Sequence, residues 1–448
     1  MGVSASRLIA LESLTEVRRS GAYIAFALSR VLERKRYATS DIGYGSRLAH
    51  LSVATYRTTS RILANYLPDP QGLPKRVHDA LAVSVTELVY LDAPDHVVDQ
   101  GVELVKHVDR RFAGLANAVL RQVASARSEI RSTSLGYAYG FDDWLARQLV
   151  DEYGTQTARE IMRVSNEQAP IFATPLSVAP DDWREQLESA GAIITDCAEH
   201  VITIEGMHAI REHPLIVSRA IPIIDPSALQ AIKLAPIGGR MLEVGCGRGT
   251  KSLIWADRAR RSTAGRNLSK VGEVLSPQIV GIDIAPQKID QARRVATGLG
   301  YHEIAYRVED ATRDNGSVAE SFDSIFVDAP CSGLGTLRRH SDKRLTLKPD
   351  DIESLAELAL EMLRSASRKA AKGASLVYAT CTISRRENDE VVTRFLDSPD
   401  GAGFSVDRIQ RSELPAPLAE SVGENGWIQM IPLSGGGDGH FIARMKRD

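Results

Sequence analysis

The chain has 448 residues, of which 43% are hydrophobic and 25% charged, and its formal net charge is −2. This length predicts two or three domains, and the composition is that of a soluble globular protein. Because the sequence contains no run of about 18 apolar residues, we expect no transmembrane helix. With so balanced a charge, a nucleic-acid partner would have to bind through local basic patches.

The four cysteines are Cys197, Cys246, Cys331 and Cys381, and no two of them lie close together in the sequence. This spacing argues against a disulfide scaffold and against a structural zinc site. Isolated thiols are typical of the reducing cytoplasm, and the N-terminal residues lack the pattern of a secretory signal. We therefore expect a cytoplasmic protein without a bound metal.

The first 130 residues carry apolar side chains at helical spacing, in segments such as "RLIALESLTEVRR" and "VHDALAVSVTELVYL". The spacing predicts amphipathic helices that pack into a bundle. Proline-containing stretches at 67–74 and 91–96 are expected to end helices, because proline lacks the amide donor and has a fixed φ. We therefore expect a helical domain over residues 1–135.

Residues 136–220 are expected to form a small linking domain of helices and strands. One or two helices are predicted between 141 and 170, and short strands follow in "FATPLSVAP", "AIITDC" and "HVITIEG". The pattern changes again near residue 221, which predicts a third domain over residues 221–448.

In this last domain, five short apolar runs each end in polar or glycine residues: "GRMLEVG", "PQIVGIDIA", "EIAYRVED", "DSIFVDAP" and "ASLVYATC". Helical segments between them, such as "APQKIDQARRVATGL", predict a doubly wound parallel sheet of the Rossmann-like α/β class. The closing segments "WIQMIPL" and "GHFIARM" predict an antiparallel pair at the sheet edge. Such sheets bind ligands beyond the carboxyl ends of their strands, so a site is expected at these polar ends.

The first of these strands leads into the glycine-rich loop "GCGRGTK", residues 245–251. Gly245, Gly247 and Gly249 let the backbone turn tightly and approach a ligand, and the next helix offers its N-terminal amides. On its own the pattern fits nucleotide, flavin and S-adenosylmethionine sites. The next acidic strand end lies further on than the ~20 residues usual in dinucleotide folds. We interpret the polar stretch 258–276 as a surface insertion that accounts for the difference.

An aspartate stands at the end of each of the next three strands: Asp283, Asp310 and Asp328. Asp283 can accept both ribose hydroxyls of a nucleoside, and Asp310 is in reach of an adenine amino group. An acid at each successive strand end favours a methyltransferase over a dehydrogenase, which makes S-adenosylmethionine the expected cofactor. The alternative is that these carboxylates only cap the following helices.

Cys331 and Cys381 stand in the polar motifs "DAPCSGLG" and "YATCTISRREN", at the ends of two predicted strands. Cysteine attacks as the thiolate. A pyrimidine ring carbon is a poor nucleophile, but thiolate addition to carbon 6 of cytosine makes carbon 5 able to attack a methyl sulfonium. A second thiol can serve in product release. The alternative, that both cysteines are semi-buried fillers, predicts apolar neighbours, whereas these are Asp, Pro, Ser, Thr, Gly and Arg.

Four segments together resemble the RsmB/NOL1/NSUN family of RNA 5-methylcytosine methyltransferases: "DAPCSGLGTLRRH", "YATCTISRRENDEVV", "IIDPSALQ" and "DGHFIARMKR". The segment "ELVYLDAPDHVVDQGVELVKHVDRRFAGLANAVLRQV" looks like the NusB-type helical domain of the RsmB branch. The resemblance covers nearly the whole chain. It implies a class I methyltransferase domain preceded by a NusB-like, RNA-binding helical domain.

The resemblance also implies a role for individual residues. It makes Cys381 the nucleophile, Cys331 the thiol needed for product release, and Asp328 the contact to the cytosine edge, beside Pro330. DNA cytosine methyltransferases take their nucleophile from a Pro-Cys motif, which would point to Cys331 instead. The residues implied for S-adenosylmethionine binding are Glu243, Gly245, Gly247, Gly249, Lys251, Asp283, Asp310 and Asp328.

Three local departures from the family pattern concern the donor loop and the RNA contacts. The family's usual loop is Cys-Ala-Ala-Pro-Gly-Gly-Lys, whereas this chain has Gly-Cys-Gly-Arg-Gly-Thr-Lys. An Arg-x-Asn strand usually follows "SNEQAP", but here the line is "FATPLSV". Ser341 and Asp342 stand where a Pro-Asp pair is common.

The resemblance implies methylation of cytosine carbon 5 in RNA, with 16S ribosomal RNA as the expected partner of a monomeric enzyme. Basic residues after the two cysteines are expected to form a rim for phosphates: Arg338, Arg339, Lys343, Arg344, Arg385 and Arg386. Two alternatives stay open, a tRNA cytosine-5 methyltransferase and a catalytically idle RNA-binding ribosome-assembly factor. A methyltransferase of amide nitrogens typically carries Asn/Asp-Pro-Pro-Tyr, whereas this chain has Asp-Ala-Pro-Cys.

Overall fold

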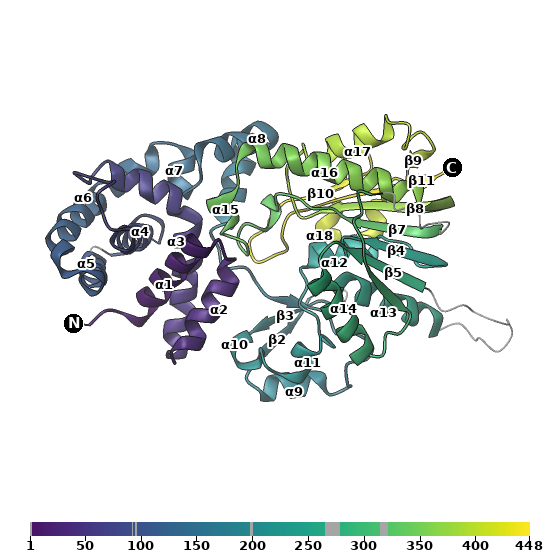
Figure 1. Cartoon of the computed structure of the whole chain (residues 1–448), viewed down its shortest axis with the longest axis horizontal. Helices are drawn as coiled ribbons and strands as arrows, with labels where there is room; N and C mark the ends of the chain where they lie inside the picture. The colour runs from purple at the N-terminus through teal and green to yellow at the C-terminus, as the bar shows by residue number, and fades with distance from the viewer. Residues whose placement is uncertain (1, 92, 95, 198–199, 265–277, 314–320) are drawn as a thin grey trace. The chain divides into compact units, whose positions relative to one another are not determined.

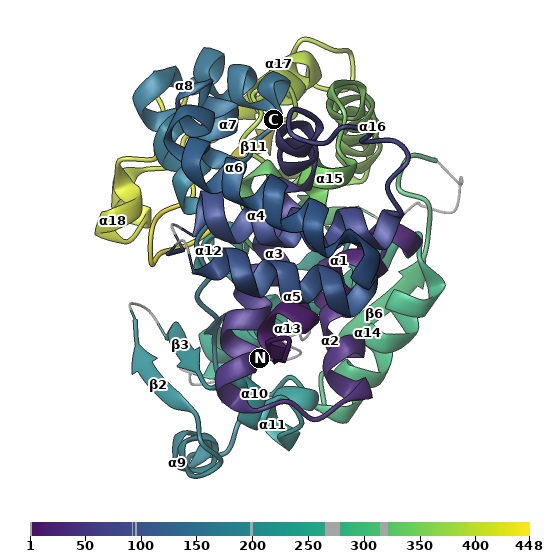
Figure 2. The ribbon, with the colours of Figure 1, turned by 90° about the vertical axis from the view of Figure 1, so that its left-hand side faces the viewer.

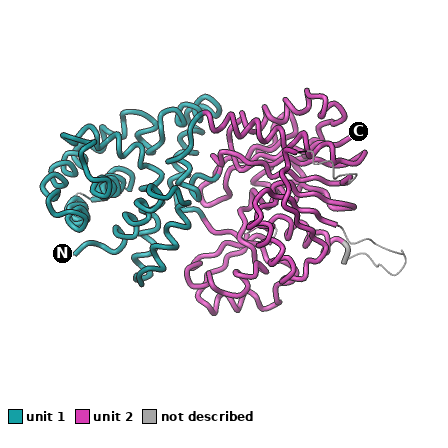
Figure 3. The backbone as a smooth tube through the Cα atoms, viewed as in Figure 1, with its two compact units in different colours: residues 1–169, 336–349 teal, residues 170–335, 350–448 magenta. Residues whose placement is uncertain are grey.

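The computed structural model describes residues 2–91, 93–94, 96–197, 200–264, 278–313 and 321–448. The chain divides into two compact units, residues 1–169 with 336–349 and residues 170–335 with 350–448 (Figure 3). The expected division into three domains, after residues 135 and 220, stays a prediction. Among the described residues, no helix has the length and apolar content needed to cross a membrane.

The first unit is helical, as predicted. Its longer helices are α1 (Ala5–Ser20), α2 (Ile24–Arg34), α3 (Thr39–Ala64), α4 (Lys75–Tyr90), α5 (Val97–Val108), α6 (Ala113–Ser132) and α8 (Asp143–Val164), with the short α7 (Leu135–Tyr139). Helix α4 is buried continuously from Asp79 to Val89, so it forms the centre of the bundle. Helices α5 and α6 pack beside it (Figure 2), and their apolar faces complete the core.

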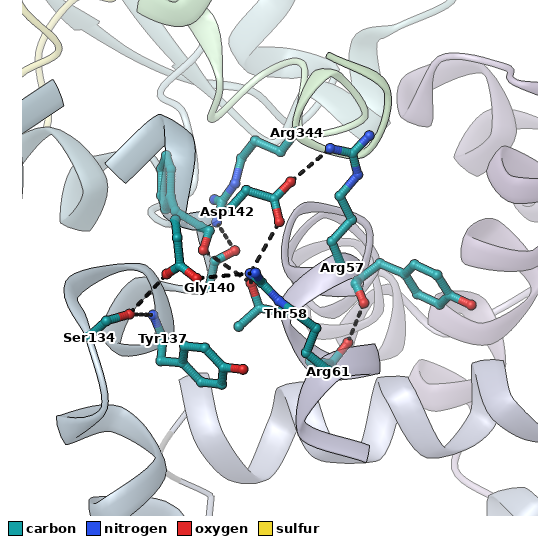
Figure 4. Close-up of polar contacts among 12 residues, drawn as sticks. Arg57, Thr58, Arg61, Ser134, Tyr137, Gly140, Asp142 and Arg344 are labelled. Atoms are coloured by element: carbon teal, nitrogen blue, oxygen red, sulfur yellow. Dashed lines mark hydrogen bonds and ion pairs between the residues drawn. The ribbon is translucent and has the colours of Figure 1, made fainter. Parts of the chain in front are cut away.

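Residues 336–349, which follow the first cysteine motif, belong to this helical unit and include the short helix α15 (Lys343–Thr346). Arg344 anchors the segment. Its guanidinium carbon lies 3.6 Å from the centre of the Phe141 ring, and its nitrogens donate to the Gly140 carbonyl at 2.7 Å and to Asn166 at 2.7 Å. Burial lowers the pKa of Arg344 to about 9. Close by, Asp142 accepts hydrogen bonds from two further arginines, Arg57 at 2.7 Å and Arg61 at 3.1 Å (Figure 4).

The second unit contains two sheets. The smaller is antiparallel, with the order β1 (Phe172–Ala173), β3 (Ile202–Glu205), β2 (Ile193–Asp196), and is accompanied by α9 (Trp183–Ser189), α10 (Met207–Ile210) and α11 (Pro214–Val217). The strands of the larger sheet are β4 (Arg240–Val244), β5 (Gln278–Asp283), β6 (Ile304–Val308), β7 (Phe322–Asp328), β8 (Ala370–Thr380), β9 (Phe404–Val406), β10 (Ile428–Met430) and β11 (His440–Arg447).

The larger sheet has the order β10-β11-β8-β7-β4-β5-β6, and β9 also pairs with β11. Strands β4 to β8 are parallel, and β9, β10 and β11 are antiparallel to their partners, so the predicted Rossmann-like sheet and its antiparallel edge are confirmed. The predicted insertion at 258–276 is wrong at its start, because Arg258 to Ala264 complete helix α13 (Thr250–Ala264). Residues 265–276 lie outside the described residues.

Helices cover both faces of the larger sheet (Figure 1). One face packs against α12 (Pro226–Lys233), α13 and α14 (Pro286–Gly298), and the other against α16 (Pro349–Arg368) and α17 (Asp389–Leu396). Along β4, Met241 faces the first of these layers and Leu242 the second, as the two-residue period of a strand requires. Because these strands are parallel, their carboxyl ends lie at one edge of the sheet, where the predicted motifs follow them.

Candidate active site

The glycine-rich loop leaves β4 and passes close to the end of β7. Gly245 has φ +78°, and a Cβ atom at this position would lie 2.4 Å from the carbonyl oxygen of Asp328. A residue with a side chain would therefore be strained and would clash with the backbone. The amide groups of Gly245 and Cys246 both donate to the carbonyl oxygen of Ile282, at 2.9 and 3.0 Å, which fixes the loop against β5.

Asp283, at the end of β5, holds the glycine-rich loop from the other side. One carboxylate oxygen accepts from the Gly247 amide at 3.0 Å, and the other accepts from the Ala285 amide at 2.9 Å. Asp310 follows β6 and accepts from the amide and the hydroxyl group of Thr312, at 3.0 and 2.7 Å. These hydrogen bonds lower the pKa of Asp310. Both acids therefore order their own loops as well as facing the cavity described next.

A cavity of about 400 Å³ lies at the carboxyl ends of the strands. Six of the predicted catalytic and cofactor-binding residues line it: Gly245, Asp283, Asp310, Asp328, Cys331 and Cys381, together with Pro330. Its apolar lining includes Ile284, Leu358 and Met362, and Ile284 is 67% exposed. The size is within the range of small-molecule sites, and the mixture of carboxylates and apolar side chains suits a nucleoside.

Four residues implied for cofactor binding are not among those that line the cavity: Glu243, Gly247, Gly249 and Lys251. Glu243 is fully buried in β4 and accepts a hydrogen bond from the hydroxyl group of Ser252, and burial raises its pKa to about 8. Gly249 packs against Tyr306, whose hydroxyl oxygen would lie 2.4 Å from an added Cβ.

Lys251, in the first turn of α13, forms an ion pair with Asp328 at the end of β7, with the ammonium nitrogen 2.7 Å from a carboxylate oxygen. Burial lowers the pKa of Lys251, but the negative charges of Asp328, Glu243 and Cys381 raise it, and the balance is upward. The lysine therefore carries a positive charge at neutral pH, beside both Asp328 and Cys381.

The two cysteines meet at the ends of adjacent parallel strands. Cys331 follows β7 and Cys381 follows β8, and their sulfur atoms lie 3.3 Å apart. The Gly335 amide donates to the Cys381 carbonyl at 3.1 Å, and the Gly439 amide donates to the Gly335 carbonyl at 2.9 Å. A Cβ on Gly335 would lie 2.1 Å from the Gly439 carbonyl oxygen, so this close approach of the two backbones requires glycine.

The other two cysteines take no part in this site. Cys246 belongs to the glycine-rich loop and is buried, which raises the pKa of its thiol, and Cys197 is exposed. In the part of the chain that the structure describes, no group of three metal-ligating side chains occurs.

The predicted basic rim is wrong for three of its six residues. Arg344 and Arg338 are buried, at 6% and 5% exposure. Arg386 pairs with carboxylates at both ends of its guanidinium group, Glu353 and Glu390. The charges of Arg338 and Arg344 are held inside the protein, where a charge taken out of water needs partners of its own. Arg386, 33% exposed, is engaged instead by neighbouring carboxylates.

His440, the first residue of β11, was not predicted from the sequence. It is buried, and its Nδ1 has no hydrogen-bond partner among the described residues. Burial lowers its pKa from 6.5 to about 4, the positive charge of Lys251 acts in the same direction, and Asp328 and Asp438 oppose the shift. The imidazole is therefore neutral in the folded protein at pH 7.

We expect His440 to make the free energy of unfolding fall as the pH decreases from about 6.5 to about 4. In this window the unfolded chain binds a proton that the folded chain does not, so acid favours unfolding. Denaturant titrations at pH 7 and pH 4.5 should show a smaller loss of stability in His440→Gln than in the wild type. His302→Gln, at an exposed position, is the control, and an equal loss in His440→Gln and wild type would contradict the expectation.

Two protein-family models match the chain. Residues 265–446 match the family model described as 16S rRNA methyltransferase RsmB/F, and residues 4–125 match the NusB family. "Ribosomal RNA small subunit methyltransferase B" of Thermus thermophilus is 29% identical, covering 100% of this chain and 99% of that protein. "Probable ribosomal RNA small subunit methyltransferase B" of Bacillus subtilis is 27% identical and covers 98% of each.

The fold is also found in a solved structure. The crystal structure of PH0851 covers 100% of both chains with a TM-score of 0.77, at 17% sequence identity. The family resemblance read from the cysteine motifs is thus confirmed independently over both ends of the chain. The chain therefore carries an RsmB/F-type methyltransferase domain over residues 265–446 and a NusB-family domain over residues 4–125, and it is similar over nearly its whole length to proteins named ribosomal RNA small subunit methyltransferase B.

Proposed function

We propose that this protein transfers a methyl group from S-adenosylmethionine to carbon 5 of a cytosine in 16S ribosomal RNA, through a covalent bond between Cys381 and carbon 6. The observation that carries the proposal is the pair of thiols, 3.3 Å apart, at the cavity that Asp283, Asp310 and Asp328 also line. A single thiol is enough for addition to a pyrimidine, but the full reaction also needs a group that takes a proton at the same place.

The residues at the strand ends fit S-adenosylmethionine. Asp283 retains lone pairs for ribose hydroxyls, since each of its oxygens accepts one backbone amide and can accept again. Ile284, Leu358 and Met362 offer apolar surface for an adenine ring next to Asp310. When bound, S-adenosylmethionine supplies a methyl group on a positively charged sulfur, which a carbon nucleophile can attack.

Cys381 would act first, as a thiolate. Its sulfur adds to carbon 6 of cytosine, a carbon–sulfur bond forms, and the electron pair of the double bond between carbons 5 and 6 moves to carbon 5. The positive charge of Lys251, which is close enough for Cys381 to raise its pKa, favours the ionised thiol. Asp328, held by Lys251 at 2.7 Å, would accept a hydrogen bond from the cytosine edge.

Cys331 would act in product release. Once carbon 5 carries the methyl group, the thiolate of Cys331 takes the remaining proton, and the electron pair of that carbon–hydrogen bond forms the double bond between carbons 5 and 6 again. In the same elimination the carbon–sulfur bond to Cys381 breaks, and its electron pair stays on the sulfur as a thiolate. Both thiols must stay reduced for this cycle, which is consistent with a cytoplasmic enzyme.

The test is to incubate the purified protein with S-adenosylmethionine carrying a deuterated methyl group, and separately with 16S ribosomal RNA, 30S particles or tRNA. Each RNA is then digested to nucleosides and examined by mass spectrometry. We expect labelled 5-methylcytidine from 16S ribosomal RNA or from 30S particles. Label on the exocyclic nitrogen of cytidine would contradict the proposed chemistry, and label in tRNA alone would contradict the substrate. No label in any RNA would favour a ribosome-assembly factor without activity.

A further inference from the structure

The residues that follow the two cysteines are joined to each other. Ser332 comes directly after Cys331, and Thr382 comes directly after Cys381. Their hydroxyl oxygens lie 2.9 Å apart, and both residues are buried, at 2% and 0% exposure. The two loops are 50 residues apart in the sequence, so the contact links two separate strand ends.

The carboxylate of Glu387 accepts hydrogen bonds from the hydroxyl groups of both Ser332 and Thr382. Oε2 accepts from the Ser332 hydroxyl at 2.5 Å and from the Thr382 hydroxyl at 3.0 Å. Oε1 accepts from the Ser332 backbone amide at 2.6 Å. Glu387 is fully buried, and neither Glu387, Ser332 nor Thr382 lines the cavity. It therefore acts on the cavity only through the two loops that it joins.

The backbone around Glu387 is held from β8 and β10. Tyr378 donates its hydroxyl hydrogen to the Glu387 carbonyl at 2.6 Å. The next residue, Asn388, accepts from the Thr380 hydroxyl at 2.6 Å and donates to the Thr382 carbonyl at 3.1 Å and to Gln429 at 2.8 Å. Because these hydrogen bonds hold the backbone at Glu387 in place, its carboxylate can fix the positions of the two cysteine loops.

We propose that Glu387 is the positioning residue that sets the distance between the two reacting thiols. This inference rests on the function proposed above, because it concerns the geometry of Cys381 during addition and of Cys331 during proton removal. Both sulfurs must reach neighbouring carbons of one pyrimidine ring, so a shift of either loop by about 1 Å costs turnover on the order of 100-fold.

The main variant is Glu387→Met, which keeps the length of the side chain and removes all three acceptor contacts. We expect kcat for RNA methylation to fall about 100-fold, while KM for RNA changes less than about threefold because Glu387 does not line the site. Glu387→Gln should recover much of the loss, since its amide oxygen can accept from the Ser332 amide while its NH₂ group donates to the two hydroxyls. The matched control is Glu390→Met, an exposed carboxylate three residues further on, which should behave as the wild type.

A second measurement reports the thiol distance without RNA or cofactor. Diamide takes two protons and two electrons from a pair of thiols, becomes a hydrazine, and leaves a disulfide. Peptide mapping gives the rate at which the Cys331–Cys381 disulfide forms, and we expect this rate to fall in Glu387→Met and to recover in Glu387→Gln. Thr382→Val removes one of the three contacts, and it should slow the disulfide more than Thr382→Ser, which keeps the hydroxyl group.

The outcomes separate the two proposals. A disulfide that forms in Glu387→Met and Thr382→Val as fast as in the wild type would overturn the role of Glu387, whatever the activity. The disulfide could form more slowly in Glu387→Met while the wild-type protein makes no 5-methylcytidine. That pair of results would support the positioning role of Glu387 and contradict the proposed reaction. A rise in KM with unchanged kcat would assign Glu387 to RNA binding and so contradict the inference.

Discussion

Replacing Cys381 with alanine is expected to reduce RNA methylation by a factor on the order of 10⁴ or more, because the loss of a covalent nucleophile removes the whole reaction path. Without the thiolate, carbon 5 of cytosine stays too weak a nucleophile to attack a methyl sulfonium. The stability of the protein should change little, since Cys381 is partly exposed and faces the cavity. Scintillation counting of a tritiated methyl group in RNA measures the loss over the required range.

The control for this variant is Cys197→Ala, which removes an exposed thiol of the small sheet region and should leave activity unchanged. Binding of S-adenosylmethionine, measured by calorimetry, should be retained in Cys381→Ala, so that the loss is assigned to chemistry. If Cys381→Ala still forms a denaturation-resistant complex with RNA, the nucleophile is another residue and the assignment is wrong.

The charge of Lys251 supports the proposal that Cys381 acts as a thiolate. Lys251 is close enough to Cys381 for the thiolate to raise the pKa of the lysine. A neighbouring ammonium group stabilises a thiolate, so the lysine that pairs with Asp328 also favours the ionised form of Cys381.

The parallel sheet and the meeting of its strand ends followed from local sequence. Asp283, Asp310 and Asp328 each end a short apolar run, and parallel strands bring such ends to one edge. The same rule applies to Cys331 and Cys381, since both follow strands of this sheet. Their separation of 3.3 Å was not predictable, because it depends on hydrogen bonds between side chains 50 residues apart.

The burial and the hydrogen-bond partners of individual charged residues could not be predicted from the sequence. Arg344 reads as a surface arginine in a basic stretch, yet it stacks on Phe141 and donates to the carbonyl of Gly140, 204 positions earlier. Glu387 reads as one polar residue among several in "SRREN", and only its burial and its contacts with Ser332 and Thr382 distinguish it from Glu390. A signal did exist in the hydroxyl-bearing residue that follows each cysteine, but it has meaning only once the two strands are known to be adjacent.

Replacing Cys331 with alanine is expected to trap the reaction rather than to prevent it. Cys381 is intact in this variant, so its sulfur still adds to carbon 6 and carbon 5 is still methylated. The proton on carbon 5 then lacks its acceptor, the thiol whose sulfur lies 3.3 Å from that of Cys381 in the wild type, and the bond between Cys381 and the RNA cannot break at the normal rate. We expect a protein–RNA complex that survives denaturing gel electrophoresis, and multiple-turnover methylation that falls on the order of 100-fold or more, the usual range for loss of a general base.

Three comparisons make this expectation specific. The methylated form of the complex should appear only when S-adenosylmethionine is present. Nuclease treatment should reduce its mass to that of the protein plus one nucleotide. The double variant Cys331→Ala/Cys381→Ala should form no complex. Peptide mapping should find that nucleotide, with its extra methyl group, on Cys381. A nucleotide attached elsewhere, or full turnover in Cys331→Ala, would mean that the thiol pair is not the catalytic unit and that another base removes the proton from carbon 5.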